Sequence, residues 1–437
     1  MSKDSKHHAL VPRLRFPEFR TGPAWLQKPL GDLTKPITER VGDSDCVPYT
    51  VTSGEGLVSQ EEKHGRTIAG KSLSNYYRLE RDDFAFNKSA TKLFPQGYIA
   101  RFQGDERAAV PSSIFTCFRI AAENVDAAYL DYLFQGNLHG RWLRDFISVG
   151  ARAHGALNIS DDDLYALPVP LPEGDQSLVE QEKIADCLGS LDNLITAEGQ
   201  KLEALLDHKQ GLMQQLFPRE GETQPRLRFP EFCDAPGWIE ESTNCVCERV
   251  MDGTHFSPQS TDGPRPYLTS KNIRNGYLDL STVTFISEED HREIYARCPV
   301  RKDDVMLTKD GASTGNCAIN YLDYEFSLLS SVAVLRGKAM KVVPAFLYYT
   351  VASPRYRRQL FDSIAGQAIT RITLTKIKEY TVVLPSLEEQ SRIAGCLAAL
   401  DDRTAAQAEK LDALRTHKRG LMQQLFPAAG DLAGGKA

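Results

Sequence analysis

Two stretches of this sequence occur twice, and this duplication constrains the fold more than any other feature. RLRFPEF at positions 13–19 recurs at 226–232, which is 213 residues later. GLMQQLFP at 211–218 recurs at 420–427, only 209 residues later, because four residues are missing from the second copy. Identities of this length at a nearly fixed separation do not arise by chance. The chain is therefore one unit of about 210 residues used twice, far longer than the repeats of about 20 to 50 residues that build solenoids.

The two copies agree at their ends and differ in the middle. The middle parts share only short similarities, such as RDD at 81–83 against KDD at 302–304. Each copy therefore consists of a variable body followed by a common tail. This arrangement is typical of one scaffold that presents two different binding surfaces.

Both tails are predicted to be long helices. Apolar residues recur along them at alternating spacings of four and three, which indicates a coiled-coil seam. Pro218 and Pro427 end the helices, so each spans about 39 residues, or about 58 Å. The expected partner of each apolar stripe is the other tail, running antiparallel; the alternative is a pair of ordinary core helices. The seam residues are Ile184, Leu188, Leu191, Leu202, Leu205 and Leu212, with Ile393, Leu397, Leu400, Leu411, Leu414 and Leu421.

The bodies have the pattern of mixed α and β structure. Short apolar segments at 84–86, 98–102 and 114–120 predict strands in the first body, and those at 305–307 and 332–335 predict strands in the second. Amphipathic segments at 127–135 and 344–353 predict one helix in each body. We therefore predict an α+β fold, with two mixed α/β domains joined by two long antiparallel coiled-coil helices and a pseudo-twofold internal repeat. The expected domains are a first body at 1–172, its helix at 173–220, a second body at 221–385, its helix at 386–427 and a flexible tail at 428–437.

The charge is distributed unevenly along the chain. The net charge of −6 argues against nucleic-acid binding, since affinity for phosphate comes mostly from Lys and Arg. However, residues 297–380 hold 13 basic and 7 acidic side chains. The acidic surplus lies elsewhere, so residues 297–380 retain a basic character that suits an anionic partner.

Other sequence signals point to a soluble cytoplasmic protein. No apolar run approaches the ~20 residues that span a bilayer, and the polar start lacks the apolar core of a secretory signal. The nine cysteines are scattered, and Cys245 and Cys247 have no second pair at zinc-finger spacing. We therefore expect reduced thiols, no metal site and no membrane association.

Motifs for catalysis are absent, with one misleading match. Residues 65–72 (GRTIAGKS) fit the P-loop pattern, but polar residues precede them where that motif needs a buried strand. We interpret them as a basic glycine-rich loop. The acidic run at 161–163 follows Ser160, which reads as a helix N-cap and first turn rather than a metal site.

The tail motifs resemble the specificity subunits of type I restriction–modification enzymes, and the resemblance covers nearly the whole chain. The segments that carry it are 170–172 with 180–185, 384–390 with 392–394, 201–218 with its twin 410–427, and the loop 307–315 (LTKDGASTG). One departure is the four extra residues at 173–176 in the first copy.

This resemblance implies a mechanism. Each body would be a target-recognition domain that binds one half of a bipartite site in double-stranded DNA, while the antiparallel tails set the spacer. Two methyltransferase subunits would pack on the tails and modify adenine with S-adenosylmethionine, and ATP-dependent translocase–nuclease subunits would join for cleavage. The subunit itself would hold no cofactor, and the S-adenosylmethionine, ATP and Mg would belong to its partners.

Two other functions stay open on the sequence alone. The chain could be a coiled-coil scaffold or decoy that binds methyltransferase subunits without recognising DNA. It could also be a nucleotide-using enzyme built on the loop at 65–72.

Basic, turn-rich segments of both bodies are the predicted DNA contacts. Arg and Lys can give hydrogen bonds to guanine in the major groove, and Asn and Gln can do so to adenine. Nearby glycines let the backbone approach phosphates closely. The alternative for each residue is an ordinary polar surface loop. The candidates are Asn87, Lys88, Arg152, His154 and Asn158 in the first body, and Lys309, Thr314, Gln367 and Arg371 in the second.

Overall fold

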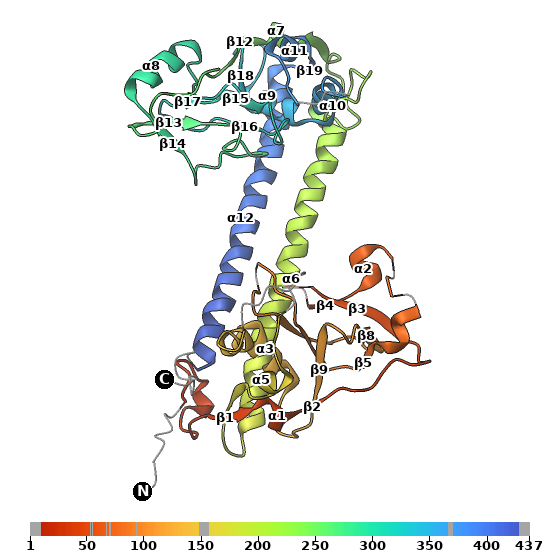
Figure 1. Ribbon diagram of the computed structural model, residues 1–437. Coiled ribbons are helices and arrows are strands. Elements are labelled where there is room, and N and C mark those ends of the chain that lie inside the picture. Colours follow the sequence, from red (N-terminus) through yellow and green to blue (C-terminus); the bar gives the residue numbers. More distant parts are fainter. Residues whose placement is uncertain are drawn as a thin grey trace. The chain divides into compact units, whose positions relative to one another are not determined.

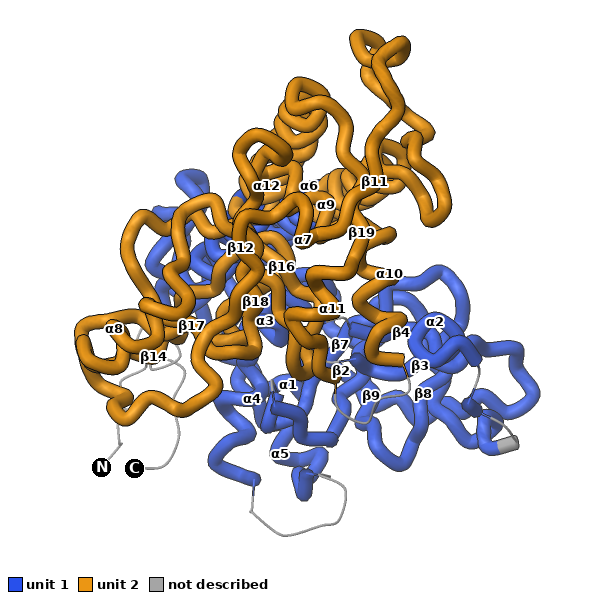
Figure 2. Tube along the Cα trace, turned by 90° about the horizontal axis from the view of Figure 1, so that it is seen from above, with its two compact units in different colours: residues 1–198, 410–437 blue, residues 199–409 orange. Residues whose placement is uncertain are grey.

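The computed structural model describes residues 10–427 apart from residues 53, 55, 67, 70, 93, 148–156 and 366–369. The chain divides into two compact units. Unit 1 combines Met1–Glu198 with Lys410–Ala437, and unit 2 is Gly199–Glu409 (Figure 2). The division falls within both tails, because each unit includes the end of the other repeat's tail. The domain bounds expected from the sequence stay a prediction.

Unit 1 contains two four-stranded sheets and a two-stranded one (Figure 1). The first has the order β2 (Thr34–Pro36), β9 (Phe115–Ile120), β6 (Phe84–Asn87), β7 (Tyr98–Arg101). The second has the order β4 (Gly56–Ser59), β3 (Val47–Thr52), β8 (Ala108–Val110), β5 (Tyr77–Leu79). The small sheet pairs β1 (Leu26–Pro29) with β10 (Pro168–Leu171). The helices of the body are α1 (Leu30–Leu33), α2 (Gln60–His64), α3 (Ala127–Gln135), α4 (Leu138–Leu143) and α5 (Asp161–Tyr165), with short 3₁₀ turns at Pro17–Phe19 and Lys71–Asn75.

The main core of unit 1 forms where α3 covers the first sheet. Phe84 of β6 lies opposite Phe118 of β9, and their rings stack at 5.3 Å between centroids. Phe134 of α3 meets Phe84 edge-on at 5.6 Å, and all three side chains are buried. The predicted strands near 84–86, 98–102 and 114–120 and the helix at 127–135 are therefore confirmed.

Unit 2 has a similar plan. A four-stranded sheet has the order β12 (Cys247–Asp252), β18 (Val332–Gly337), β15 (Val305–Thr308), β16 (Cys317–Ile319). A three-stranded sheet has the order β14 (Thr284–Ile286), β13 (Arg265–Leu268), β17 (Ser327–Leu328), and β11 (Ile239–Ser242) pairs with β19 (Thr381–Leu384). The helices are α7 (Thr243–Val246), α8 (Glu288–Arg297), α9 (Pro344–Ala352), α10 (Pro354–Asp362) and α11 (Leu374–Glu379), with a 3₁₀ turn at Pro230–Phe232. The strands predicted at 305–307 and 332–335 and the helix at 344–353 are confirmed.

The short similarity between 81–83 and 302–304 has a structural cause. Asp82 and Asp303 both adopt the left-handed conformation, with φ of 71° and 69°, in the turn that leads into β6 and β15. The next residue, Asp83 or Asp304, is buried and forms a charge-assisted pair with an arginine of the neighbouring strand. The Asp83–Arg119 and Asp304–Arg336 pairs measure 2.6 and 2.7 Å. Two bodies with different sequences therefore share one framework.

The tails form the two longest helices, α6 (Ser177–Leu216) and α12 (Leu387–Leu425), of 40 and 39 residues. In unit 1, Lys418 of α12 donates to Asp192 of α6 at 2.6 Å, and Lys410 donates to Glu198 at 2.5 Å. In unit 2, Lys209 of α6 pairs with Asp401 of α12. In unit 1 the residue number falls from 418 to 410 along α12 as it rises from 192 to 198 along α6, so the helices pack antiparallel, as predicted.

The predicted seam residues face inward along both helices. Six of them are buried, namely Ile184, Leu188, Ile393, Leu397, Leu400 and Leu411. The other six are half-buried, namely Leu191, Leu202, Leu205, Leu212, Leu414 and Leu421. The first turns of each seam belong to the core of the adjoining body, since Ile184 and Leu188 pack in unit 1 and Ile393 and Leu397 in unit 2.

The duplicated motifs hold each unit together. In unit 1, Arg15 of RLRFPEF pairs with Glu180 at 2.7 Å, and the Leu14 amide donates to the Gln424 carbonyl at 2.9 Å. The ring of Phe426 lies 5.5 Å from that of Tyr129. GLMQQLFP is therefore a docking segment by which the end of one repeat enters the body of the other.

Unit 2 repeats these contacts. Arg228 pairs with Glu389 at 2.7 Å, and the Leu227 amide donates to the Gln215 carbonyl at 2.9 Å. Phe217 stacks on Phe346 at 5.5 Å. The pseudo-twofold internal repeat is thus confirmed at the level of single contacts. None of the helices in the described part of the chain is both long and apolar enough to cross a membrane.

Candidate nucleic-acid interface

In unit 1, two of the predicted segments come together at the end of β6. Asn87 ends this strand, and its side-chain oxygen accepts a hydrogen bond from the Ser89 amide at 3.0 Å. The Leu157 amide donates to the Lys88 carbonyl at 2.8 Å, which brings the exposed Asn158 beside Lys88. Arg152 and His154 lie outside the described residues.

The Lys88 amine is already engaged within unit 1. It donates to Asp161 at 2.8 Å and to the Ile159 carbonyl at 3.3 Å. Burial alone would raise the pKa of Asp161, but hydrogen bonds from Lys88 and Thr116 lower it overall. Lys88 would have to exchange this carboxylate for a DNA phosphate or base to make the predicted contact.

In unit 2, Lys309 lies inside the protein. Only 2% of it is exposed, and its amine lies 3.1 Å from Asp310 and 3.4 Å from Asp252. This geometry gives Lys309 a positioning role, because a buried amine held between two carboxylates fixes the loop that follows. A direct contact of Lys309 with DNA stays a prediction.

The loop after Lys309 is a tight turn that needs its glycines. Gly311 and Gly315 have φ of 89° and 93°, a conformation that residues with a Cβ rarely adopt. The Thr314 hydroxyl donates to the Gly311 carbonyl at 2.7 Å inside this turn. The predicted loop at 307–315 is therefore an ordered structure.

Arg371 lies beside that loop although it is distant in sequence. The Ile372 amide donates to the Lys309 carbonyl at 3.0 Å, and the Gly311 amide donates to the Thr370 carbonyl at 3.2 Å. The Arg371 side chain is exposed there, whereas Gln367 lies outside the described residues. The bond from Ile372 to Lys309 is the counterpart of the bond from Leu157 to Lys88, so both units join the same two segments.

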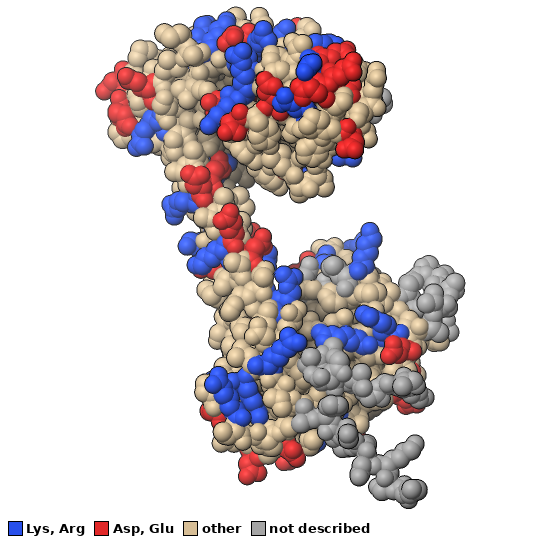
Figure 3. Space-filling model, turned by 90° about the vertical axis from the view of Figure 1, so that its left-hand side faces the viewer, with Lys and Arg blue, Asp and Glu red and all other residues tan. Residues whose placement is uncertain are grey.

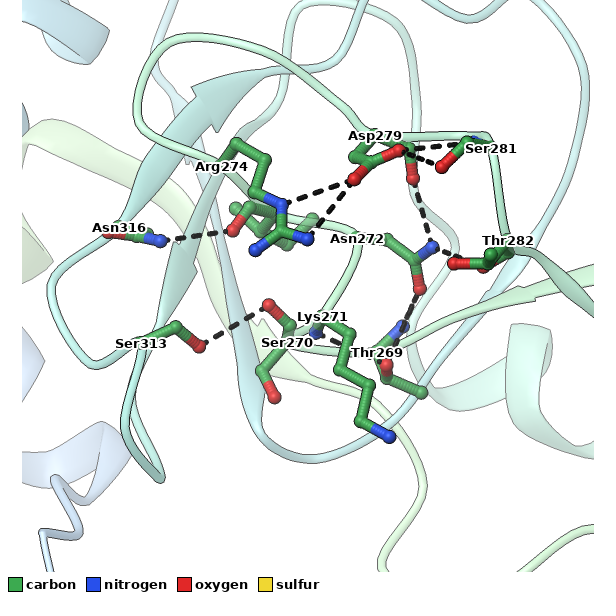
Figure 4. Close-up of polar contacts among 11 residues, drawn as sticks. Thr269, Ser270, Lys271, Asn272, Arg274, Asp279, Ser281, Thr282, Ser313 and Asn316 are labelled. Atoms are coloured by element: carbon green, nitrogen blue, oxygen red, sulfur yellow. Dashed lines mark hydrogen bonds and ion pairs between the residues drawn. The ribbon is translucent and has the colours of Figure 1, made fainter. Parts of the chain in front are cut away.

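Sequence reasoning missed a polar turn at 269–282 that packs against this loop. Asn272, only 3% exposed, holds the turn closed (Figure 4). Its side-chain oxygen accepts from the Thr269 amide at 2.9 Å, and its nitrogen donates to the carbonyls of Asp279 and Thr282 at 3.0 and 2.9 Å. A buried amide with three backbone contacts makes the turn rigid.

The turn and the loop present one continuous polar surface. The Ser313 hydroxyl donates to the Ser270 carbonyl at 3.4 Å, and the Asn316 side chain donates to the Ile273 carbonyl at 3.3 Å. The exposed Lys271 extends away from these contacts, and its amine has no partner among the described residues (Figure 4). Arg274 pairs with Asp279 at 3.1 Å. The signal in the sequence was KNIRNG at 271–276, a basic, amide-rich run closed by a glycine.

The surroundings of the P-loop match and of the acidic run explain both segments. Residues 65–72 follow α2 rather than a strand, and Gly65 is the left-handed residue that ends this helix, with φ of 65°. Ser160 caps α5 by accepting from the Asp163 amide at 3.1 Å, as predicted for the acidic run. In the part of the chain that the structure describes, no group of three or more His, Cys, Asp or Glu side chains could hold a metal ion.

Basic side chains gather on parts of both units (Figure 3). On the face shown, unit 1 carries several patches of Lys and Arg with few acidic residues between them, while unit 2 carries basic and acidic patches side by side. The protein can therefore offer local basic surfaces in spite of its net charge of −6.

Comparison with known proteins agrees with this geometry. Residues 253–416 match the family model for the type I restriction modification DNA specificity domain. A type I restriction enzyme MjaX specificity subunit of Methanocaldococcus jannaschii is 24% identical over 360 residues, which cover 80% of this chain and 79% of that protein. The EcoBI specificity subunit of Escherichia coli is 33% identical over 122 residues, or 28% of this chain and 25% of that protein.

Solved structures support the fold. The crystal structure of the type I restriction–modification S subunit from M. genitalium superimposes with a TM-score of 0.56 at 14% identity, covering 96% of this chain and 99% of that one. A structure described as explaining complex assembly and conformational transition of the type I system has the same TM-score at 17% identity, covering 92% and 97%. In its duplicated bodies, its antiparallel tails and its match to the specificity-domain model at 253–416, the chain is similar to the specificity subunits of type I restriction–modification systems.

Proposed function

We propose that this subunit recognises a bipartite target in double-stranded DNA, with one body for each half-site. The observation that carries the proposal is that the two units share the same supporting contacts but present different side chains on them. Both join a strand end to a distant segment through equivalent backbone bonds, from Leu157 to Lys88 and from Ile372 to Lys309. Different side chains then stand at this position, as two different half-sites require.

The antiparallel tails suit a spacer between the half-sites. Helix length is proportional to residue number at 1.5 Å per residue, and duplex length is proportional to base pairs at about 3.4 Å. Four residues inserted in each tail would add about 6 Å, or close to two base pairs. The spacer of the target would then depend on the number of helical turns.

The tails also offer surface for partner subunits. Leu194 and Leu206 of α6 are 41% and 50% exposed although both are leucines in a helix with a buried seam. We infer that methyltransferase subunits bind there and supply S-adenosylmethionine chemistry at adenine. ATP and Mg would belong to translocase–nuclease subunits, and the assembly would act in the cytoplasm, where nine free cysteines stay reduced.

A domain exchange tests the proposal. Residues 238–384 would be replaced by the same span of a relative with a different target, and the complex with its methyltransferase subunits would be expressed in a host. Methylome sequencing should then show a change in one half-site only, with the other half-site and the spacer retained.

Two results would contradict the proposal. A change in both half-sites would show that the bodies do not recognise DNA independently. Assembly with methyltransferase subunits but no sequence-specific binding by the unexchanged protein would identify a scaffold or decoy instead.

A further inference from the structure

Unit 1 contains a groove where the end of α12 meets the body, and the proposed DNA recognition does not use it. Its volume is about 690 Å³. Its apolar floor comes from Leu133 and Leu138 of the body and from Met422 and Phe426 of α12. We call it the α12 groove.

Unit 2 contains the equivalent groove at the end of α6. Met213, Gln214, Phe217 and Pro218 line it, where Met422, Gln423, Phe426 and Pro427 line the α12 groove. Arg358 of this second groove corresponds to Arg141 of the first, since each follows its body's main helix. The two grooves therefore share one framework, and their occupants can be compared.

The groove of unit 2 carries a segment of the chain itself. The residues after Pro218 form one wall, and Glu220 pairs with Arg358 at 2.8 Å. Arg355 donates to the carbonyls of Arg219 and Glu222 at 3.1 and 2.6 Å. An acidic peptide segment thus lies against arginines at this site.

The α12 groove has the arginines without the acids. Among the described residues that line it, five are cationic and none is acidic: Arg13, Arg141, Arg415, Lys418 and Arg419. Two of them pair with aspartates outside the lining, Lys418 with Asp192 at 2.6 Å and the exposed Arg415 with Asp412 at 3.6 Å. Among the described residues, Arg13 makes no ion pair, and Arg141 donates to the Gly136 carbonyl at 2.5 Å and pairs with no carboxylate. Burial lowers the pKa of Arg141, so a carboxylate beside it would be favourable.

We propose that the α12 groove binds an acidic peptide segment of a partner protein. The carboxylates would pair with Arg141, Arg415 and Arg419 as Glu220 pairs with Arg358, while apolar side chains would cover Met422 and Phe426. The apolar floor favours a peptide over a nucleic-acid backbone, because phosphates and sugars gain little from burial against such side chains. The chain's own continuation after Pro427 begins AAG and lacks the two glutamates that follow Pro218.

The experiment measures binding of a labelled peptide to the full chain by fluorescence anisotropy. The probe is the peptide of residues 218–224 (PREGETQ), because this segment lines the equivalent groove and pairs there with Arg355 and Arg358. Arg415→Glu combined with Arg419→Glu should weaken binding at least ~10-fold, since two charge-assisted contacts become repulsive. The matched control, Arg144→Glu, changes an exposed arginine of unit 1 that does not line the groove, and should leave binding unchanged.

Four results would overturn the proposal. The first is no binding of the peptide at ~1 mM, the weakest affinity of interest. The second is equal binding of a peptide in which both glutamates are replaced by glutamine. The third is an effect of the double variant on binding of a mixed-sequence DNA duplex but not of the peptide, which would make the groove a phosphate site. The fourth is peptide binding at least ~10-fold tighter after deletion of residues 428–437, which would identify the chain's own terminus as the occupant.

Discussion

Units 1 and 2 differ most at their surfaces and least in the contacts that hold them together. The pairs Arg15–Glu180 and Arg228–Glu389 measure 2.7 Å in both units, and each joins an RLRFPEF segment to the first turns of a long helix. Beside this common support, Lys88 binds Asp161 in unit 1, whereas Lys309 is buried between two carboxylates in unit 2. The same supporting contacts therefore position different side chains in the two units.

This difference shows which parts of a duplicated chain are free to change. The repeated motifs form ion pairs, backbone bonds and ring contacts within each unit, so a change in one copy disturbs its unit. The exposed Asn158 and Arg371 carry no such load, because the backbone bonds of Leu157 and Ile372 beside them already fix their position. Under the proposed function, a change of DNA target in one body would not require rebuilding of the other.

The largest expected effect comes from breaking the helix pair in both units at once. Leu202 and Leu411 occupy the same place in the two tails and lie in unit 2 and unit 1, respectively. Changing both to Asp buries two unpaired charges, which should abolish assembly with methyltransferase subunits. Co-purification of tagged methyltransferase measures this loss.

The two single variants show whether both units depend equally on the helix pair. Leu411 is 5% exposed and Leu202 is half-buried, so Leu411→Asp should be the more damaging change. Normal assembly of a folded double variant would contradict the pairing of the tails as the basis of assembly.

A smaller effect is expected from the buried ion pairs. Glu180→Gln and Glu389→Gln each leave an arginine with a weakened partner, and loss of one partner of a buried pair costs about 3 to 5 kcal/mol. The side chains of both pairs are at most 11% exposed, so the two variants should destabilise their own units by similar amounts. Hydrogen exchange resolved by peptide can follow each unit separately.

The exposed pair Arg358–Glu220 provides the control. Both of its side chains are 65% exposed, so Glu220→Gln should cost less than about 1 kcal/mol. A much larger loss for only one of the two buried pairs would show that the units are alike in geometry but not in energy.

The sequence was sufficient for the elements that depend on local pattern. Heptad spacing predicted α6 and α12, since an apolar stripe of this length is typical of a helix that packs against a second helix. The duplication predicted two related bodies. It did not predict that each unit contains the end of the other tail, because the contact of Phe426 with Tyr129 joins residues almost three hundred positions apart.

The candidate surface was harder to predict for a physical reason. Lys309 is of a residue type that often contacts DNA. Its burial between Asp252 and Asp310, however, depends on strands β12 and β15, whose proximity cannot be read from the sequence. Lys271 lies in the basic, amide-rich run at 271–276, but only the Asn272 hydrogen bonds and the contact with Ser313 show that it stands on a rigid turn. Tertiary contacts, rather than residue type, distinguish the exposed Lys271 from the buried Lys309.

The smallest expected effect tests that distinction at a single exposed amine. If Lys271 contacts a base, Lys271→Ala should cost about 1 to 3 kcal/mol on the specific duplex and relax one position of the target. If it contacts a phosphate, binding to all sequences should weaken alike, and the slope of affinity against salt should fall by about one. Lys302→Ala is the matched control, because Lys302 is also exposed but precedes β15, at the end of that strand opposite the loop after Lys309. Titrations of the assembled complex on specific and scrambled duplexes at several salt concentrations separate these outcomes, and unchanged affinity for both duplexes in the Lys271→Ala protein would remove the 269–282 turn from the DNA interface.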